Sequence, residues 1–173
     1  MNIFYLHENP KTCAEMHCDK HVVKMILEYA QLLSTAHHVL DGVPSVDCYK
    51  MTHKNHPSAV WARETTGNYW WLWNLLMELC GEYTYRYGKV HATERKGIVG
   101  ELVSQPHNML RGGFTEPPIC MKEEFKLDNV IESYHNYYLL DKIRFAKWTK
   151  REEPRWWRDK MSIQVTSPLS KVA

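Results

Sequence analysis

Apolar residues recur with a helical period in the first quarter of the chain. Between residues 12 and 40 they return every three or four positions, and at 100° per residue they fall on one broad side of a helix. This apolar side consists of Val22, Met25, Ile26, Tyr29, Leu32, Leu33, Ala36 and Leu40. Thr12 and Glu15 fit a capping box at the start, and Asp41 with Gly42 fits a stop at the end. We therefore predict one helix over residues 12–40.

The same pattern predicts further helices along the chain. His56 and Pro57 open a second long helix, because proline is tolerated at the first helical position, and Gly88 closes it. The other predicted elements are a bend near Thr66-Gly67, a short helix over about 92–103, a long loop near 104–122, a helix from Asp128 to about Trp148, and a basic, aromatic tail from about residue 149. With no repeats and no convincing strand pairs, an all-α fold is expected. We predict a single compact helical domain over residues 1–173, with the tail packed on it or extending from it.

Composition places the chain among ordinary globular proteins. Hydrophobic residues make up 44% and charged residues 24%, and the formal net charge is +2. Because this charge is nearly neutral, a nucleic-acid surface would have to come from local clustering of cations. The five cysteines form no CxxC pair and there is no signal peptide, which indicates a reduced intracellular protein. The apolar run WWLWNLLMELC stops at eleven residues, so no membrane span is expected.

A narrower polar stripe lies opposite or beside the apolar side of the first helix. It consists of His17, His21, Lys24, Glu28, Gln31, Thr35 and His38. Glu28 is at its middle. Three histidines, a lysine and a glutamate resemble a reactive site more than the lysine and glutamate coat of a solvated helix. The stripe is therefore a candidate functional site.

Three interpretations of this stripe remain open. It could be a solvated face, in which Lys24 and Glu28 form an i,i+4 ion pair worth about 0.2–0.5 kcal/mol. It could transfer protons through Glu28, with His21 and Lys24 setting its environment or contacting phosphate. It could also bind a metal ion through two helix histidines spaced i,i+4 and others from the following loop. The histidines of that site would be His17, His21, His53 and His56.

Several motifs resemble those of a known enzyme family. They are MNIFYLH at the N-terminus, Asp19-Lys20-His21 followed by Glu28 seven residues after the histidine, VLDG over 39–42, YKMTHKNHPSAVWAR over 49–63, EYTYRYGK over 82–89 and FAKWTKREEPRWW over 145–157. These motifs are similar to segments of the bacteriophage pyrimidine dimer DNA glycosylases of the endonuclease V type. Those proteins are compact, all-helical enzymes that combine glycosylase with abasic-site lyase activity. The resemblance covers most of the chain, in patches.

The resemblance implies a nucleophile at the N-terminus. In this family the α-amino group attacks the sugar C1′, expels the base and forms a Schiff base, while a glutamate stabilises the cationic sugar and shuttles protons. These roles transfer to Met1 and Glu28. An α-amine, with a pKa of about 7.7–8.0 against about 10.4 for lysine, is partly neutral at physiological pH. The large side chain of Asn2 indicates that Met1 is retained, and Lys24, one turn before Glu28, is an alternative nucleophile.

The predicted DNA contacts differ from those of the family. The family has arginines immediately before and three residues after the catalytic glutamate, where this chain has Leu27 and Gln31. A different mode of DNA contact is therefore expected. The predicted DNA-contacting residues are Lys20, His21, Lys24, Lys54, Asn55, His56, Arg63, Arg86, Lys89, Arg151, Arg155 and Trp156.

Together, the residues and the resemblance predict a DNA glycosylase with abasic-site lyase activity on double-stranded DNA. It would act on damaged or modified bases as a monomer and would need no metal or other cofactor. No association with a membrane is expected. A cytoplasmic location is expected, that of a host cell if a phage encodes the chain. Two alternatives come from other classes: a non-catalytic helical module that binds DNA or protein, and a metal-dependent hydrolase with histidine ligands.

Overall fold

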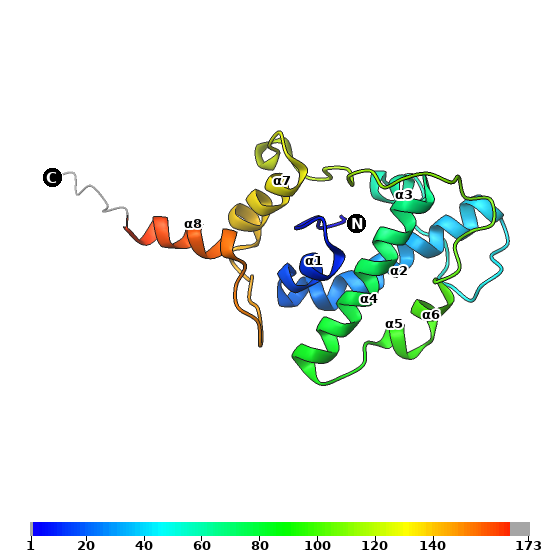
Figure 1. The fold of residues 1–173 in the computed structure, drawn as a ribbon, viewed down its shortest axis with the longest axis horizontal. Helices are drawn as coiled ribbons and strands as arrows, with labels where there is room; N and C mark the ends of the chain where they lie inside the picture. Colours follow the sequence, from blue (N-terminus) through cyan, green and yellow to red (C-terminus); the bar gives the residue numbers. More distant parts are fainter. Residues whose placement is uncertain (1, 167–173) are drawn as a thin grey trace.

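The computed structural model describes residues 2–166, and every regular element in this range is a helix (Figure 1). In chain order the elements are α1 (Pro10–Met16), α2 (Asp19–Asp41), α3 (Pro57–Ala62), α4 (Thr66–Tyr87), α5 (Ala92–Arg95), α6 (Ile98–Glu101), the 3-10 turn η1 (Glu123–Phe125), α7 (Val130–Tyr137), the π-helical turn η2 (Tyr138–Lys142) and α8 (Arg155–Thr166). The prediction of an all-α fold is confirmed. The predicted long loop is also present, since the chain between α6 and η1 has no regular structure.

The core forms where α2 and α4 pack against each other, with α1 packed on α4 (Figure 1). Seven of the eight residues predicted for the apolar side of α2 are buried, and Leu40 at the end of the helix is partly buried. The helix α4 contributes a matching buried stripe that consists of Tyr69, Leu72, Leu75, Leu76 and Leu79. Each fully buried aliphatic side chain contributes about 1.5–3 kcal/mol to folding. The three- and four-residue spacing thus accounts for the central helix pair.

The single long helix predicted for the first part of the chain is wrong, because two extended residues separate α1 from α2. The carbonyl groups that end α1 are hydrogen-bonded to side chains from distant parts of the chain. Arg86 donates to the carbonyls of Glu15 and His17 at 3.0 and 2.8 Å. The indole of Trp148 donates to the carbonyl of Met16 at 2.9 Å. These donors satisfy groups that a continuing helix would otherwise have paired with its own backbone.

Other helix boundaries also differ from the prediction. The second long helix is two helices, α3 and α4, because the hydroxyl of Thr65 caps the start of α4. The short third helix is divided into α5 and α6 at Gly97, which has a positive φ of 80°. The last predicted helix ends earlier, in the π-helical turn η2. At the start of α1 the capping side chain is Asn9, which accepts from the amide of Thr12 at 3.1 Å.

The long loop before η1 crosses the first turn of α4 at close range. The amide of Gly67 donates to the carbonyl of Gly112 at 3.0 Å. A Cβ atom at Gly67 would lie 2.4 Å from the backbone of Gly113, so glycine is required for this crossing. The contact fixes the loop on the body as it runs from α6 on one side of the molecule to α7 on the other (Figure 1).

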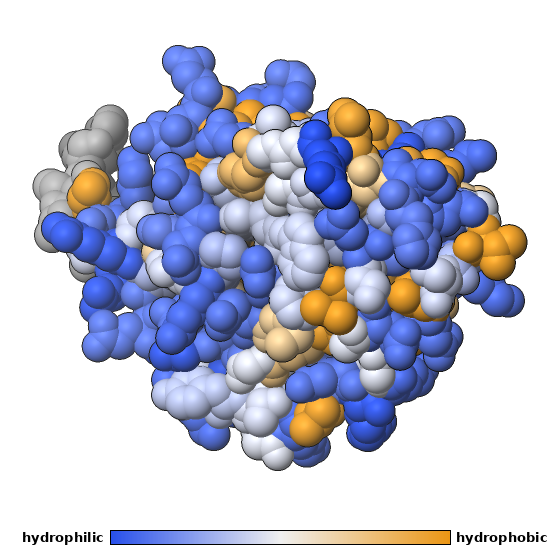
Figure 2. All heavy atoms as spheres, turned by 45° about the vertical axis from the view of Figure 1, so that its right-hand side comes forward, coloured by the Kyte–Doolittle hydropathy of each residue, from blue (hydrophilic) through white to orange (hydrophobic). Residues whose placement is uncertain are grey.

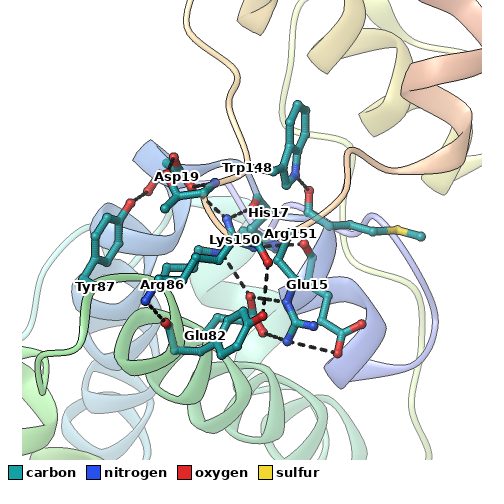
Figure 3. A network of polar contacts seen from close by, with 12 residues as sticks. Glu15, His17, Asp19, Glu82, Arg86, Tyr87, Trp148, Lys150 and Arg151 are labelled. Atoms are coloured by element: carbon teal, nitrogen blue, oxygen red, sulfur yellow. Dashed lines mark hydrogen bonds and ion pairs between the residues drawn. The ribbon is translucent and has the colours of Figure 1, made fainter.

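A buried charge network attaches the C-terminal segment to the helical body (Figure 3). The fully buried side chain of Arg86 donates to Glu82 at 3.0 Å and to Asp19 at 3.1 Å. Glu82 also accepts from Arg151 at 3.2 Å. Asp19 accepts from the amide and the hydroxyl of Thr149 at 2.9 and 2.7 Å. The start of the basic, aromatic tail is therefore held against α2 and α4.

Replacing Arg86 by methionine should lower the free energy of unfolding by about 3–5 kcal/mol, because Glu82 and the half-buried Asp19 would lose their buried partner. Urea denaturation followed by circular dichroism measures this change. The control is Lys89→Met, since Lys89 is exposed just after the same helix, and its effect should stay within about 0.5 kcal/mol. A loss of similar small size in both variants would show that the network does not hold the tail.

Candidate active site

The N-terminal segment is buried along α2. Residues 3–6 are each at most 6% exposed, and this segment lies between α7 and α4 in Figure 1. The amide of Phe4 donates to the hydroxyl of Tyr29 at 3.0 Å. Because Tyr29 directly follows Glu28, the segment runs beside the part of α2 that carries this glutamate. Met1, whose α-amine is the predicted nucleophile, lies outside the described residues.

Glu28 lies on the outer side of α2 with its side chain 15% exposed. Lys24, one turn earlier, is 70% exposed and pairs with it at 3.1 Å, and Lys20 is exposed one further turn away. His56 approaches from the N-terminus of α3. Burial is the main cause that lowers the pKa of His56, and the negative charge of Glu28 opposes this shift only in part. The arrangement provides a largely buried carboxylate with one cation beside it, which is suited to proton transfer with a bound molecule.

His17 is completely buried and neutral. Its Nδ1 donates to the carbonyl of Cys13 at 2.7 Å, and its Nε2 accepts from the hydroxyl of Tyr29 at 3.1 Å. Burial lowers the pKa of His17 to about 4. The proposed histidine metal site is not formed, because both ring nitrogens of His17 are occupied. Within residues 2–166 no three or more histidine, cysteine, aspartate or glutamate side chains are grouped so that they could hold a metal ion.

Side chains from α7 and η2 cover the N-terminal segment and enclose His21. The ring of His21 stacks on Phe4 with centroids 4.0 Å apart, and its Nδ1 lies 2.5 Å from the hydroxyl of Tyr138. Burial is the main cause that lowers the pKa of His21 to about 2, so this residue is neutral. On the same side His135 donates to the carbonyl of Leu6 at 2.9 Å. Sequence reasoning missed Tyr138, since no local pattern links residues 117 positions apart.

Four of the predicted DNA contacts gather at the start of α3. Lys54 and Asn55 are exposed in the loop before this helix, and His56 caps it. Arg63 donates to the carbonyl of Lys54 at 2.7 Å, so it shapes the loop that presents the exposed pair. Because α3 packs on α2, this group is presented by a helix that lies against the one carrying the candidate site.

Five other predicted DNA contacts lie around the C-terminal end of α4 and in the tail, and the structure does not join them to Glu28. They are Arg86, Lys89, Arg151, Arg155 and Trp156. The prediction for Arg86 is wrong, because its guanidinium is buried and donates to protein acceptors. Arg151 is held by Glu82, and Trp156 stacks on His135 with ring centroids 4.1 Å apart. Lys89 and Arg155 stay exposed.

The face of the molecule drawn in Figure 2 is largely polar. In Figure 2 the visible face is mostly hydrophilic, and its hydrophobic side chains occur in small separate groups. Contacts with a partner on this face would therefore be mainly polar. None of the helices within residues 2–166 has the length and apolar character needed to cross a membrane.

The fold and the site define a class of protein: a compact, all-helical protein that buries its N-terminal segment against the central helix that carries Glu28. Residues 1–95 match the family described as pyrimidine dimer DNA glycosylase, and the chain belongs to this family. It is therefore a DNA-repair protein of the glycosylase type, with DNA as its substrate. The matched region runs through α5 and includes Glu28. Comparisons with curated proteins and with solved structures gave no match.

Proposed function

We propose that this protein removes damaged bases from double-stranded DNA and then cleaves the strand at the resulting abasic site. Pyrimidine dimers are the lesion class that the family description supplies. The observation that supports the proposal is the burial of residues 3–6 beside Tyr29, on the helix that bears Glu28.

The α-amine of Met1 is the proposed nucleophile. Its lone pair forms a bond to C1′ of the damaged nucleotide, and the base leaves with the electron pair of the broken C1′–N bond and takes up a proton. Loss of a proton from the attached nitrogen and opening of the bond between C1′ and the ring oxygen then give a Schiff base. Removal of a proton from C2′ expels the 3′ phosphate oxygen, and hydrolysis of the imine releases the protein.

Glu28 is the proposed proton carrier. As a carboxylate it stabilises the positive charge that develops on the sugar while the base leaves. It then takes the proton from the attached nitrogen, delivers it to the ring oxygen and removes the proton from C2′. Because the side chain of Glu28 is only 15% exposed, water screens its interaction with the sugar less than it would on an open surface.

Borohydride should trap an adduct between the protein and duplex DNA that contains one abasic site. Reduction requires an imine, so the trapped peptide identifies the nucleophile, and we expect the N-terminal peptide. A short extension at the N-terminus should reduce trapping by about a hundredfold, because it displaces the reacting amine. Lys24→Met should retain the adduct, since the Lys24 side chain is 70% exposed and its nitrogen is held in an ion pair with Glu28.

An extension of the same length at the C-terminus is the control and should leave trapping unchanged. Loss of the adduct in Lys24→Met, with retention in the N-terminally extended protein, would assign the nucleophile to Lys24 instead. Absence of an adduct in every form, with duplex binding intact, would favour a non-catalytic DNA-binding module.

A further inference from the structure

Three cations surround the ring of Phe145, between η2 and the start of α2. The Lys20 ammonium lies 4.5 Å from the ring centroid, the Lys142 ammonium 6.0 Å and the Arg144 guanidinium carbon 5.9 Å. Lys20 and Arg144 are exposed, and neither forms an ion pair with a carboxylate among residues 2–166. Like charges gathered on one ring repel one another, so an anion bound between them would be stabilised.

His21 adds a neutral donor to the same place. Burial raises the pKa of Tyr138 and so keeps its hydroxyl proton in place. An imidazole nitrogen is a better acceptor than the neighbouring thiol of Cys18, so Tyr138 donates to Nδ1 of His21 and the imidazole carries its own proton on Nε2. Nε2 of His21 has no hydrogen-bond partner among residues 2–166. It is not among the unpaired side-chain atoms of these residues that are sealed from solvent. Nε2 is therefore an N–H group without a protein acceptor, in a residue that is 6% exposed, and the charges of Lys142 and Lys24 act on the same ring.

The surface around Phe145 carries an excess of positive charge. Its charged residues are the cations Lys20, Lys24, Lys142, Arg144 and Lys147, the carboxylates Glu28 and Asp141, and the ion pair of Asp19 with the buried Arg86. Lys24 is paired with Glu28 at 3.1 Å and Lys142 with Asp141 at 2.6 Å. Six cations less three paired carboxylates leave a charge of +3. The surface thus suits a polyanion that runs along α2 toward Glu28.

We propose that Lys20, His21, Lys142, Arg144 and Phe145, here named the Phe145 cluster, bind the phosphodiester backbone of the DNA strand that carries the lesion. This inference rests on the proposed function. Lys20 and Arg144 attract the phosphate oxygens, and Lys142 adds positive charge behind them. His21 donates one hydrogen bond from Nε2, and Phe145 supplies an apolar surface for the sugar. The three residues of the cluster in and after η2 lie outside the region matched to the family.

The position of the cluster on α2 sets its distance from the damaged nucleotide. Lys20 and Glu28 are eight positions apart in the chain, which corresponds to about 12 Å along the helix axis. One strand of duplex DNA advances about 3.4 Å per nucleotide, so with α2 aligned along the duplex axis the bound phosphate lies roughly three or four nucleotides from the damaged one.

The double variant Lys20→Gln/Arg144→Gln tests the inference on duplex DNA with a stable abasic-site analogue. Fluorescence anisotropy should show binding weaker by about tenfold, and the slope of log K against log salt should fall in magnitude by about 0.9 for each lost phosphate contact. Both side chains are exposed, so thermal unfolding should match the wild type. A neutral methylphosphonate placed roughly three or four nucleotides from the analogue should weaken wild-type binding but not weaken the variant further.

The matched control is Arg95→Gln/Lys96→Gln, which removes the same charge from exposed positions at the end of α5, on the other side of α4 from α7 and η2 (Figure 1). Its salt slope should be that of the wild type. An unchanged affinity and slope in Lys20→Gln/Arg144→Gln would overturn the inference, and so would an equal loss in the control.

Borohydride trapping by the wild-type protein separates this inference from the proposed function. If trapping fails while the salt slope still depends on Lys20 and Arg144, the enzymatic proposal is lost and the phosphate-binding role of the Phe145 cluster stands. If trapping succeeds while the slope is unaffected, the Phe145 cluster alone is rejected.

Discussion

Glu28→Gln should slow strand cleavage at abasic sites by about a thousandfold while leaving the fold intact. Glutamine has the size and shape of glutamate but does not carry protons at neutral pH, and general acid–base groups contribute about 10²–10⁴-fold to a rate. The ion pair that would be lost joins Glu28 to a 70% exposed lysine, Lys24, so stability should fall by only about 0.3–0.5 kcal/mol. Single-turnover cleavage of an abasic duplex and thermal unfolding measure the two effects.

Glu101→Gln is the matched control, because Glu101 is an exposed glutamate at the end of α6. This variant should cleave at the wild-type rate. Cleavage at the wild-type rate by Glu28→Gln would reduce Glu28 to a surface residue paired with Lys24.

Acidification from pH about 6.5 to about 4 should lower the free energy of unfolding by on the order of 6 kcal/mol through two buried histidines. His17 and His21 are 0% and 6% exposed, and burial is the main cause that lowers their pKa to about 4 and about 2. In the unfolded chain each has a pKa of about 6.5, so below that pH the unfolded state binds more protons than the folded state. Each histidine then removes up to about 1.4 kcal/mol of stability per pH unit. The loss ends near pH 4 for His17 and continues below it for His21.

The variant His17→Gln isolates one part of this effect. Its amide can still accept from the Tyr29 hydroxyl but does not titrate, so stability should fall with pH less steeply, by about 1.4 kcal/mol per pH unit. His107→Gln changes an exposed imidazole and should keep the wild-type slope. Urea denaturation at a series of pH values gives the slopes, and equal slopes for His17→Gln and the wild type would contradict the assignment.

The core helices could be predicted from the sequence because their apolar residues lie on one side. The spacing of Val22, Ile26 and Leu33 on α2 depends only on local helical geometry, and all three side chains are fully buried. Glu28 could be singled out in the same way, as the carboxylate at the middle of the polar side, and the structure places it partly buried beside Lys24. Its chemical role stays a prediction.

The ends of the helices and the environment of the histidines could not be predicted, because they depend on partners far along the chain. The first helix ends where Arg86 and Trp148 take up its carbonyl groups, and neither residue is near it in the sequence. His21 has the helical spacing of a surface residue, but Phe4 and Tyr138 enclose it from two other segments. Periodicity describes one helix at a time and carries no information on what covers its polar side.

Because the ribosome synthesises the chain from its N-terminus, the contact between Leu6 and His135 can form only late in translation. These residues are 129 positions apart, so the N-terminal segment emerges long before α7 can cover it. At about 5–20 residues per second this interval lasts on the order of ten seconds. A nascent chain that already contains all of residues 1–95, the part matched to the family, still lacks α7, η2 and the hydrogen bond from Arg151 to Glu82. The candidate site is therefore completed only late in translation, and contacts of such high sequence separation should make folding slow for a helical protein.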